Sequence, residues 1–388
     1  APQRPAAAPA AAAEPVTAHV VDTATTGSSV EPAVALATGR VETLRMPSTM
    51  LGAGFELVQV QAKGADRPLN FLLGSGFPVN ALTEKGSKLL GIQPALYTGG
   101  WASQAKEQAA SNEVEDVRFV GSGSPIGTLK NVEVLDFPQA VLCEQMGVEI
   151  HGMLGRPFYE EFDLDLDRYG QKLQLYAPGQ AASQGFYSTV KFLPGLSLPG
   201  SNFGIAVRGL GIDDETGTQK ENYFVGLVDT GAAHTMINWE AAKLLGYDGP
   251  NDVALQGATK VLGANSRGVA EEMPVVRVRL ALCGVMEGVK PAMMGVSKEQ
   301  YEASGGNGWY FQRLTEGQNG VVELGAVNVA IGDALGLSVL SDSQVGPFKG
   351  AAAIIGQDLL FQNQRVVLNT QDKQMWLEPG DVRDAEEM

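Results

Sequence analysis

The chain has 388 residues, which is enough for two or three domains of ordinary size. Its 28 Lys and Arg residues against 44 Asp and Glu residues give a formal net charge of −16, which argues against a nucleic-acid partner because phosphate contacts need clustered cations. The 48 glycines and the 19% of charged residues are typical of a turn-rich β protein. The longest uncharged stretch, residues 192–207, is interrupted by prolines and is too short to span a bilayer, so we expect no membrane span.

The first segment, residues 1–40, is rich in Ala, Pro, Thr and Ser and has few apolar anchors. Because such a composition cannot offset the entropy of ordering the chain, we predict a disordered arm. The sequence begins with Ala rather than Met, which would suit a chain processed after import into an organelle, with a plastid as our guess, or exported from the cell. At the other end, residues 381–388 are predicted to form an acidic, solvated tail.

The middle of the chain contains an internal repeat. Residues 72–91 align without a gap on residues 227–246, and six of the twenty aligned positions are identical. In both copies an apolar strand enters a glycine turn and a second short apolar step follows. A helix then opens at a polar cap, Thr83 or Asn238, and ends at a glycine. The repeat predicts a strand, a tight turn, a strand and a helix, twice.

The surroundings of the two copies correspond as well. A β-hairpin is predicted at residues 55–73 before the first turn and at residues 203–228 before the second. Further along, Met153-Leu154-Gly155 matches Ile354-Ile355-Gly356. Duplication of one unit is the simplest explanation.

The duplication predicts a division into lobes. We expect an N-terminal lobe at residues 41–180, a linker at 181–200 and a C-terminal lobe at 201–380. The second copy is longer, and the excess includes residues 287–320, whose role the sequence does not reveal.

Each copy resembles one lobe of a pepsin/retropepsin-like aspartic protease. The resemblance rests on Asp229-Thr230-Gly231 at the end of a strand, on the downstream Ile354-Ile355-Gly356, and on the presence of the arrangement twice. It covers residues 45–380 and implies an all-β fold, a bilobal double β-barrel with short helices and a cleft between its lobes. Members of the family hydrolyse peptides with two aspartates, one from each lobe, that share a proton.

The first copy lacks its aspartate. Gly74 stands at the position that matches Asp229, while Ser75 and Gly76 match the hydroxyl residue and the glycine that follow Asp229. In the family, this hydroxyl donates a hydrogen bond to the other lobe. The resemblance therefore implies that the fastening between the lobes is kept while the acid–base pair needed for hydrolysis is lost.

We accordingly expect a catalytically silent protein that binds a peptide or a protein segment, or that serves as a subunit of a larger assembly. An alternative is an active aspartic endopeptidase in which Asp229 works with a substitute acid or pairs with another chain. A small-molecule binder that uses the cleft is a third option.

The resemblance also implies a flap, a hairpin that closes over the cleft. In the first lobe it falls on a Gly-Gly tip flanked by aromatic residues. Tyr97, Gly99, Gly100 and Trp101 are therefore candidates for peptide binding, and packing of the two aromatic rings on their own lobe is the alternative.

The remaining polar residues indicate no cofactor and no metal. Cys143 and Cys283 are too few for a disulfide framework or a four-cysteine zinc site, and we expect two unpaired thiols. His19, His151 and His234 lie too far apart in the sequence for a zinc-binding motif.

Three further groups of polar residues could have a functional role. Asp163, Asp165 and Asp167 alternate with apolar residues on a predicted strand, and we expect a solvated face because ligands along a strand are too linear to enclose a calcium ion. His234, five residues after Asp229, is a candidate for a chemical role near the cleft. Ser75 as a nucleophile would need a positioned base, and the sequence marks none.

Overall fold

The structure is a computed structural model, and it describes residues 34–47, 52–93, 112–181, 191–212, 218–264, 270–285, 320–340 and 350–379. The chain divides into two units after Glu31, and every described residue lies in the second unit. Four predicted features fall outside the described residues, namely residues 1–33 of the predicted arm, the flap positions Tyr97, Gly99, Gly100 and Trp101, the insertion as far as residue 319, and the tail at 381–388.

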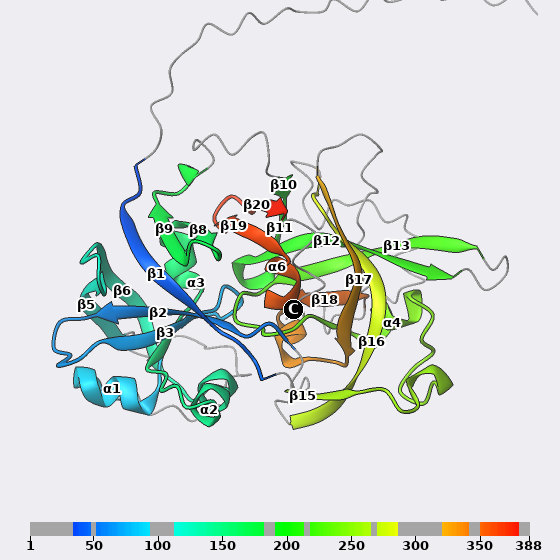
Figure 1. The fold of residues 1–388 in the computed structure, drawn as a ribbon, viewed down its shortest axis with the longest axis horizontal. Coiled ribbons are helices and arrows are strands. Elements are labelled where there is room, and N and C mark those ends of the chain that lie inside the picture. Colours follow the sequence, from blue (N-terminus) through cyan, green and yellow to red (C-terminus); the bar gives the residue numbers. More distant parts are fainter. Residues whose placement is uncertain are drawn as a thin grey trace, which may run out of the picture. The chain divides into compact units, whose positions relative to one another are not determined.

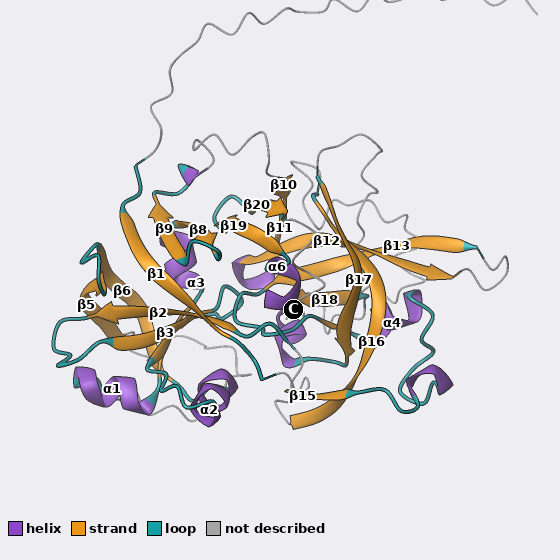
Figure 2. Ribbon diagram, viewed as in Figure 1, coloured by secondary structure: helices purple, strands orange, loops and turns teal. Residues whose placement is uncertain are grey.

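Strands dominate the described structure and its helices are short (Figure 2). The first half contributes β2 (Phe55–Gln61), β3 (Leu69–Leu73), β4 (Asn80–Leu82), β5 (Asn112–Phe119), β6 (Pro125–Val134) and β7 (Gly152–Leu154). These six strands follow one another in the order β2-β3-β7-β4-β6-β5, and because β5 also pairs with β2, they close into a barrel.

The second half builds a barrel of the same kind. Its strands are β12 (Asn202–Ile212), β13 (Gln219–Val228), β14 (Met236–Ile237), β16 (Ala270–Cys283), β17 (Val321–Ile331) and β18 (Ala352–Ile355). They run in the order β12-β13-β18-β14-β17-β16 and are closed by pairing of β12 with β16. The short strands β11 (Leu196–Leu198) and β15 (Lys260–Ala264) extend this sheet at its two ends. Strand for strand, the order repeats that of the first barrel. Figure 1 labels β2, β3, β5 and β6 of the first barrel and β12, β13, β16, β17 and β18 of the second.

Both halves contribute strands to a third stretch of sheet. These strands are β1 (Ala37–Leu44), β8 (Asp163–Asp167), β9 (Lys172–Tyr176), β10 (Lys191–Pro194), β19 (Asn363–Asn369) and β20 (Gln374–Pro379). Their order is β10-β20-β19-β8-β9-β1. The antiparallel pair of β8 with β19 joins the first half to the second, with Leu166 opposite Val366.

Apolar side chains fill both barrels. Val58 and Phe71 are buried in the first barrel, and Val207 and Phe224 are buried in the second. Each such side chain contributes roughly 1.5–3 kcal/mol by its removal from water.

The helices are α1 (Glu84–Leu90), α2 (Pro138–Gln145), α3 (Arg156–Glu161), α4 (Trp239–Leu244) and α6 (Gln357–Leu360), with short 3-10 turns η3 (Pro199–Ser201), η4 (Val253–Leu255) and η6 (Leu335–Leu340). α1 and α4 begin at the predicted caps, because Thr83 accepts the Gly86 N–H at 3.1 Å and Asn238 accepts the Ala241 N–H at 3.0 Å. Within the described ranges, no helix combines the length and the apolar character that crossing a membrane requires.

The predicted all-β architecture of two duplicated barrels with short helices is confirmed. Two boundaries differ from the prediction. β1 begins at Ala37, inside the range 1–40 predicted as a disordered arm, because residues 37–40 pair with β9. β10 and β11 lie inside the predicted linker 181–200, where β10 pairs with β20.

The predicted solvated face of β8 is wrong for two of its three aspartates. Asp163 and Asp165 are each 1% exposed, and Asp167 is partly buried. Asp165 forms a two-pronged ion pair with Arg365 of β19, with Nε 2.6 Å from Oδ1, and Asp163 accepts the Ala181 N–H at 2.9 Å. The physical reason is that these side chains meet partners from distant parts of the chain, Arg365 of β19 and the backbone at Ala181, in place of water.

Candidate functional site

The candidate site lies where β3 and β13 end, at the two glycine turns. In each half a later strand inserts beside the turn: β7 pairs parallel with β3, and β18 pairs parallel with β13. Gly74 donates its N–H to the Leu154 carbonyl at 3.0 Å, and Asp229 donates its N–H to the Ile355 carbonyl at 3.0 Å. The two turns therefore start from the same backbone contact.

The next hydrogen bonds also correspond. The Phe77 N–H donates to the Gly74 carbonyl at 3.0 Å, and in the second turn the Ala232 N–H donates to the Asp229 carbonyl at 3.2 Å. The carbonyls of Phe77 and Ala232 in turn accept the N–H groups that open α3 and α6, at 2.7 and 2.8 Å. Backbone geometry thus repeats the duplication seen in the sequence.

The glycines at the ends of the inserted strands are required by close packing. A Cβ at Gly155 would lie 1.8 Å from the carbonyl oxygen of Val79, and a Cβ at Gly356 would lie 2.6 Å from the carbonyl carbon of His234. No real Cβ approaches another atom that closely, so each position accepts only glycine without a shift of the backbone.

Two hydroxyl groups connect the turns across the halves. Ser75 donates its N–H to Thr230 Oγ1 at 3.0 Å, and Thr230 donates its N–H to Ser75 Oγ at 3.1 Å. Ser75 Oγ also donates to the Val228 carbonyl at 3.1 Å. The hydroxyl contact that the resemblance implied is therefore present. Among the described residues, Ser75 Oγ donates its proton to the backbone carbonyl of Val228 and not to a side-chain base.

A third hydroxyl belongs to this latch, and sequence reasoning missed it. Tyr159 of α3 is 1% exposed and its hydroxyl lies 2.7 Å from Thr230 Oγ1. Its carbonyl accepts the Thr370 hydroxyl at 2.7 Å. We call Ser75, Thr230 and Tyr159 the latch. Burial raises the pKa of the Tyr159 hydroxyl, so it remains protonated.

Two glutamines add to the contacts of the second turn. Gln139 of α2 donates from Nε2 to the Gly231 carbonyl at 3.2 Å, which links the first half to the second. Gln357 of α6 donates to the Thr230 carbonyl. The second turn is thereby held from both halves.

Asp229 is the carboxyl group of the site. Its Oδ1 accepts the N–H of Gly231 at 2.8 Å and the N–H of Gly76, from the other half, at 3.1 Å. The residue is partly exposed. Burial of the carboxylate raises the pKa of Asp229, and the two backbone donors oppose that rise; no ionisable side chain of the described residues contributes to the shift.

Gly74 lies against the turn that carries this group. A Cβ built on Gly231 would lie 3.1 Å from the Gly74 Cα, so the two turns are in contact. A Cβ built on Gly76 would lie 2.5 Å from the Asp229 Cγ, so the glycine after Ser75 is needed to accommodate Asp229.

The space beside Gly74 is filled by Met153 of β7. A Cβ at Gly74 would lie 2.5 Å from the Met153 sulfur. Sequence reasoning did not assign Met153 a role. The only sequence signal was that Met153 stands where the second copy has Ile354.

His234 and Asp358 lie beside the second turn. Burial lowers the pKa of His234 to about 4, and its buried Nε2 has no hydrogen-bond partner among the described residues. Burial raises the pKa of Asp358 to about 6, although the Thr235 N–H and hydroxyl donate to its carboxylate at 2.9 and 2.7 Å. Asp358 therefore holds the turn against α6, and among the described residues no hydrogen bond joins it to Asp229.

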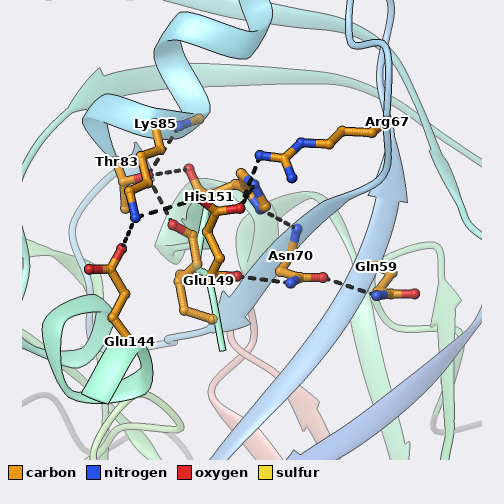
Figure 3. Close-up of polar contacts among 10 residues, drawn as sticks. Gln59, Arg67, Asn70, Thr83, Lys85, Glu144, Glu149 and His151 are labelled. Atoms are coloured by element: carbon orange, nitrogen blue, oxygen red, sulfur yellow. Dashed lines mark hydrogen bonds and ion pairs between the residues drawn. The ribbon is translucent and has the colours of Figure 1, made fainter. Parts of the chain in front are cut away.

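A second polar cluster surrounds His151, just before β7 (Figure 3). His151 Nδ1 accepts the Asn70 N–H at 2.9 Å, and its Nε2 lies 3.4 Å from Glu149. Glu149 also meets Arg67 at 3.0 Å and Lys85 at 3.5 Å. Burial lowers the pKa of His151, against the effect of Glu149. The His151 carbonyl accepts the Thr83 N–H at 2.9 Å, so the cluster secures the start of α1.

The cysteines are unpaired, as predicted. Cys143 and Cys283 are both buried, and burial raises the pKa of Cys143 to about 12 and that of Cys283 to about 11. The described residues contain no group of three or more His, Cys, Asp or Glu side chains arranged to hold a metal ion.

The chain matches no protein-family model and no curated protein sequence. The solved structures to which it is similar include the following three. An aspartic proteinase from Irpex lacteus is 13% identical, with 89% of this chain and 97% of that chain covered and a TM-score of 0.42. Basic 7S globulin from soybean is 11% identical over 90% and 96% of the two chains, with a TM-score of 0.41. Conglutin gamma from lupine seeds is 10% identical over 90% and 97%, with a TM-score of 0.39.

Proposed function

We propose that this chain is a catalytically silent, pepsin-like protein that binds a peptide or a protein segment, or that serves as a subunit of an assembly. One observation carries the proposal: the first turn, which contacts the turn of Asp229, has Gly74, without a side chain, at the position that matches Asp229. The retained latch supports it, because the contacts that hold the two turns together have been kept.

The chemistry explains why one carboxyl group is not enough. Hydrolysis by this family needs a carboxylate to take a proton from water and a carboxyl to polarise the peptide carbonyl. Loss of one acid–base group costs about 10²–10⁴ in rate, and groups that act as a unit lose more than their sum suggests. Asp229 alone can supply only one of the two roles at a time.

A substitute acid is the first alternative, and the electrostatics of Asp229 do not favour it. No ionisable side chain of the described residues perturbs Asp229, and the buried carboxylate of Asp358 is held by Thr235. Pairing of second turns between two chains is the other alternative. It would require the latch between Ser75 and Thr230 to open.

Incubation with a peptide library between pH 3 and 7 tests whether the chain lacks peptidase activity. We expect no turnover by the purified chain beyond that of an Asp229→Ala variant. Pepstatin-sensitive turnover that Asp229→Ala abolishes would contradict the proposal, and a rate that rises with the square of protein concentration would identify pairing between chains.

Binding is tested separately. We expect the immobilised chain to enrich specific sequences from a random-peptide library, with saturable affinity in solution. Absence of any enriched peptide, together with absence of a crosslinked partner when the chain is recovered from its native source, would contradict the binding role.

A further inference from the structure

We propose that Met153 is a second residue that keeps this site silent, because its thioether occupies the position that the Cβ of an acidic side chain at residue 74 would need. This inference rests on the proposed function and deepens it. It predicts that restoring an acid at residue 74 alone leaves the site inactive.

The backbone of Gly74 does not exclude a side chain. Its φ lies outside the left-handed region that favours glycine, and the equivalent backbone in the second turn carries Asp229 with matching hydrogen bonds. The obstacle is steric. A Cβ at Gly74 would lie 2.5 Å from the Met153 sulfur and 3.1 Å from its Cγ, well inside the separation of about 3.5–4.0 Å at which non-bonded atoms attract.

The second half provides the reference for an occupied turn. Met153 pairs with Leu72 in the first half, and Ile354 pairs with Leu227 at the same register in the second. Both side chains are buried. Isoleucine is branched at Cβ and stiff, whereas methionine is unbranched and adapts to fill irregular gaps. The half with the aspartate has the stiff residue, and the half without it has the gap-filling one.

The backbone donors for a second carboxylate are still in place. The Gly231 N–H donates to the aspartate of its own turn, and the Gly76 N–H, its equivalent, now donates to the same oxygen of Asp229. A carboxylate at residue 74 would find the Gly76 N–H within its own turn, as Asp229 finds that of Gly231. Met153 is therefore the group that has to move before the pair can form.

A restored pair would have the chemistry of an acid–base dyad. The ionised carboxylate takes a proton from water, the water oxygen bonds to the peptide carbonyl carbon, and the protonated carboxyl stabilises the resulting oxyanion. The C–N bond then breaks as a proton passes to the leaving amine. The products are a carboxylic acid and an amine, and no further reactant is needed.

The test compares the wild-type chain with Gly74→Asp, Met153→Ile and the double variant, each confirmed as folded by circular dichroism. We expect the wild type and both single variants to remain at the background of Asp229→Ala. The double variant should gain at least about 10²-fold in peptide turnover at acid pH, and adding Asp229→Ala should abolish the gain. Met153→Val, which is shorter, serves as a second partner for Gly74→Asp.

The outcomes separate this inference from the proposed function. A Gly74→Asp variant as active as the double variant would overturn the role of Met153 and leave the silence of the wild type intact. Folded double variants that are silent with both Ile and Val would also overturn it. Activity in the wild type would overturn the proposed function itself.

An NMR measurement, which does not depend on peptide turnover, tests the role of Met153 independently. In Gly74→Asp, the methyl ¹³C signal of Met153 should shift, because the new side chain crowds the thioether. The methyl signal of Met273, which is buried in the core of the second half, should stay in place. An unchanged Met153 signal in the folded variant would overturn the inference.

Discussion

The turn at residues 74–76 and the turn at residues 229–231 are held by equivalent backbone hydrogen bonds and differ in the side chains around them. Each turn is fixed by an inserted parallel strand and by a glycine at the end of that strand. Only the second turn carries a carboxyl group. The difference teaches that each barrel depends on the backbone of its turn and not on an acid at the turn.

In the two halves, equivalent backbone N–H groups donate to different side chains. The N–H of Gly155 donates to Asn80 Oδ1 at 2.9 Å, and the N–H of Gly356 donates to Thr235 Oγ1 at 3.0 Å. In the second half Thr235 also binds Asp358. The two turns are therefore equivalent in backbone and distinct in the charges beside them.

The largest expected effect comes from the glycines that both turns require. Gly155→Ala should lower the free energy of unfolding by about 3 kcal/mol or more, because the new Cβ would meet the Val79 carbonyl. Gly356→Ala should act in the same direction and less strongly, since its contact is longer. Urea denaturation measures both.

Gly320→Ala is the control for these glycine variants, because a Cβ there meets nothing nearer than 3.5 Å. Its effect should be within about 1 kcal/mol. If Gly155→Ala were no more destabilising than Gly320→Ala, the close packing described here would be incorrect.

The pH dependence of the free energy of unfolding should distinguish the contributions of His234 and Asp358, which lie beside the second turn. His234 has a pKa lowered from 6.5 to about 4, so the unfolded chain binds the extra proton and stability from this group rises as pH increases from 4 to 6.5. Asp358 has a pKa raised from 3.8 to about 6, so the folded chain binds the extra proton and stability from this group falls as pH increases from 4 to 6.

The two contributions oppose each other in the wild type, each with a magnitude of about 3 kcal/mol, since one pKa unit corresponds to about 1.4 kcal/mol. His234→Leu should make the stability fall more steeply from pH 4 to 6. Asp358→Asn, which keeps an acceptor for Thr235, should make it rise. Slopes that change in the same direction in both variants would contradict the assignment of these groups.

Smaller effects on the free energy of unfolding are expected from the latch. Thr230 of the second turn contacts both Ser75 of the first turn and Tyr159. Thr230→Val leaves the Ser75 N–H and the Tyr159 hydroxyl without their partner and should cost about 2–3 kcal/mol. Tyr159→Phe leaves Thr230 bonded to the Ser75 N–H and should cost about 1 kcal/mol.

Tyr223→Phe is the matched control for the latch, because the Tyr223 hydroxyl binds Glu221 at an exposed position. It should change the free energy of unfolding by less than about 0.5 kcal/mol. Equal effects of Tyr159→Phe and Tyr223→Phe would remove Tyr159 from the latch.

Much of the fold could be predicted because its signals are local. The glycine turns, the polar caps Thr83 and Asn238, and the apolar strands recur at matching positions of the two copies, and each is recognisable within about twenty residues. The position of Gly74 opposite Asp229 followed from the same alignment.

The rest depends on contacts between distant parts of the chain. Tyr159 reaches Thr230 across 71 positions, and Arg365 reaches Asp165 across 200. An alternating strand such as β8 has the same pattern whether its polar face meets water or an arginine from another strand. Met153 likewise differs from its counterpart Ile354 by a change between two apolar residues, which has meaning only once its sulfur is placed beside Gly74.

The central claim is that the two turns bring together one carboxyl group. The direct measurement is an NMR titration of the carboxyl carbon of Asp229 in the wild-type chain, with Asp229→Asn to assign the signal. We predict a single proton-binding step with a pKa above the usual range of an aspartate. Two coupled steps spread over several pH units would mean that a second acid shares the proton, and would contradict the account.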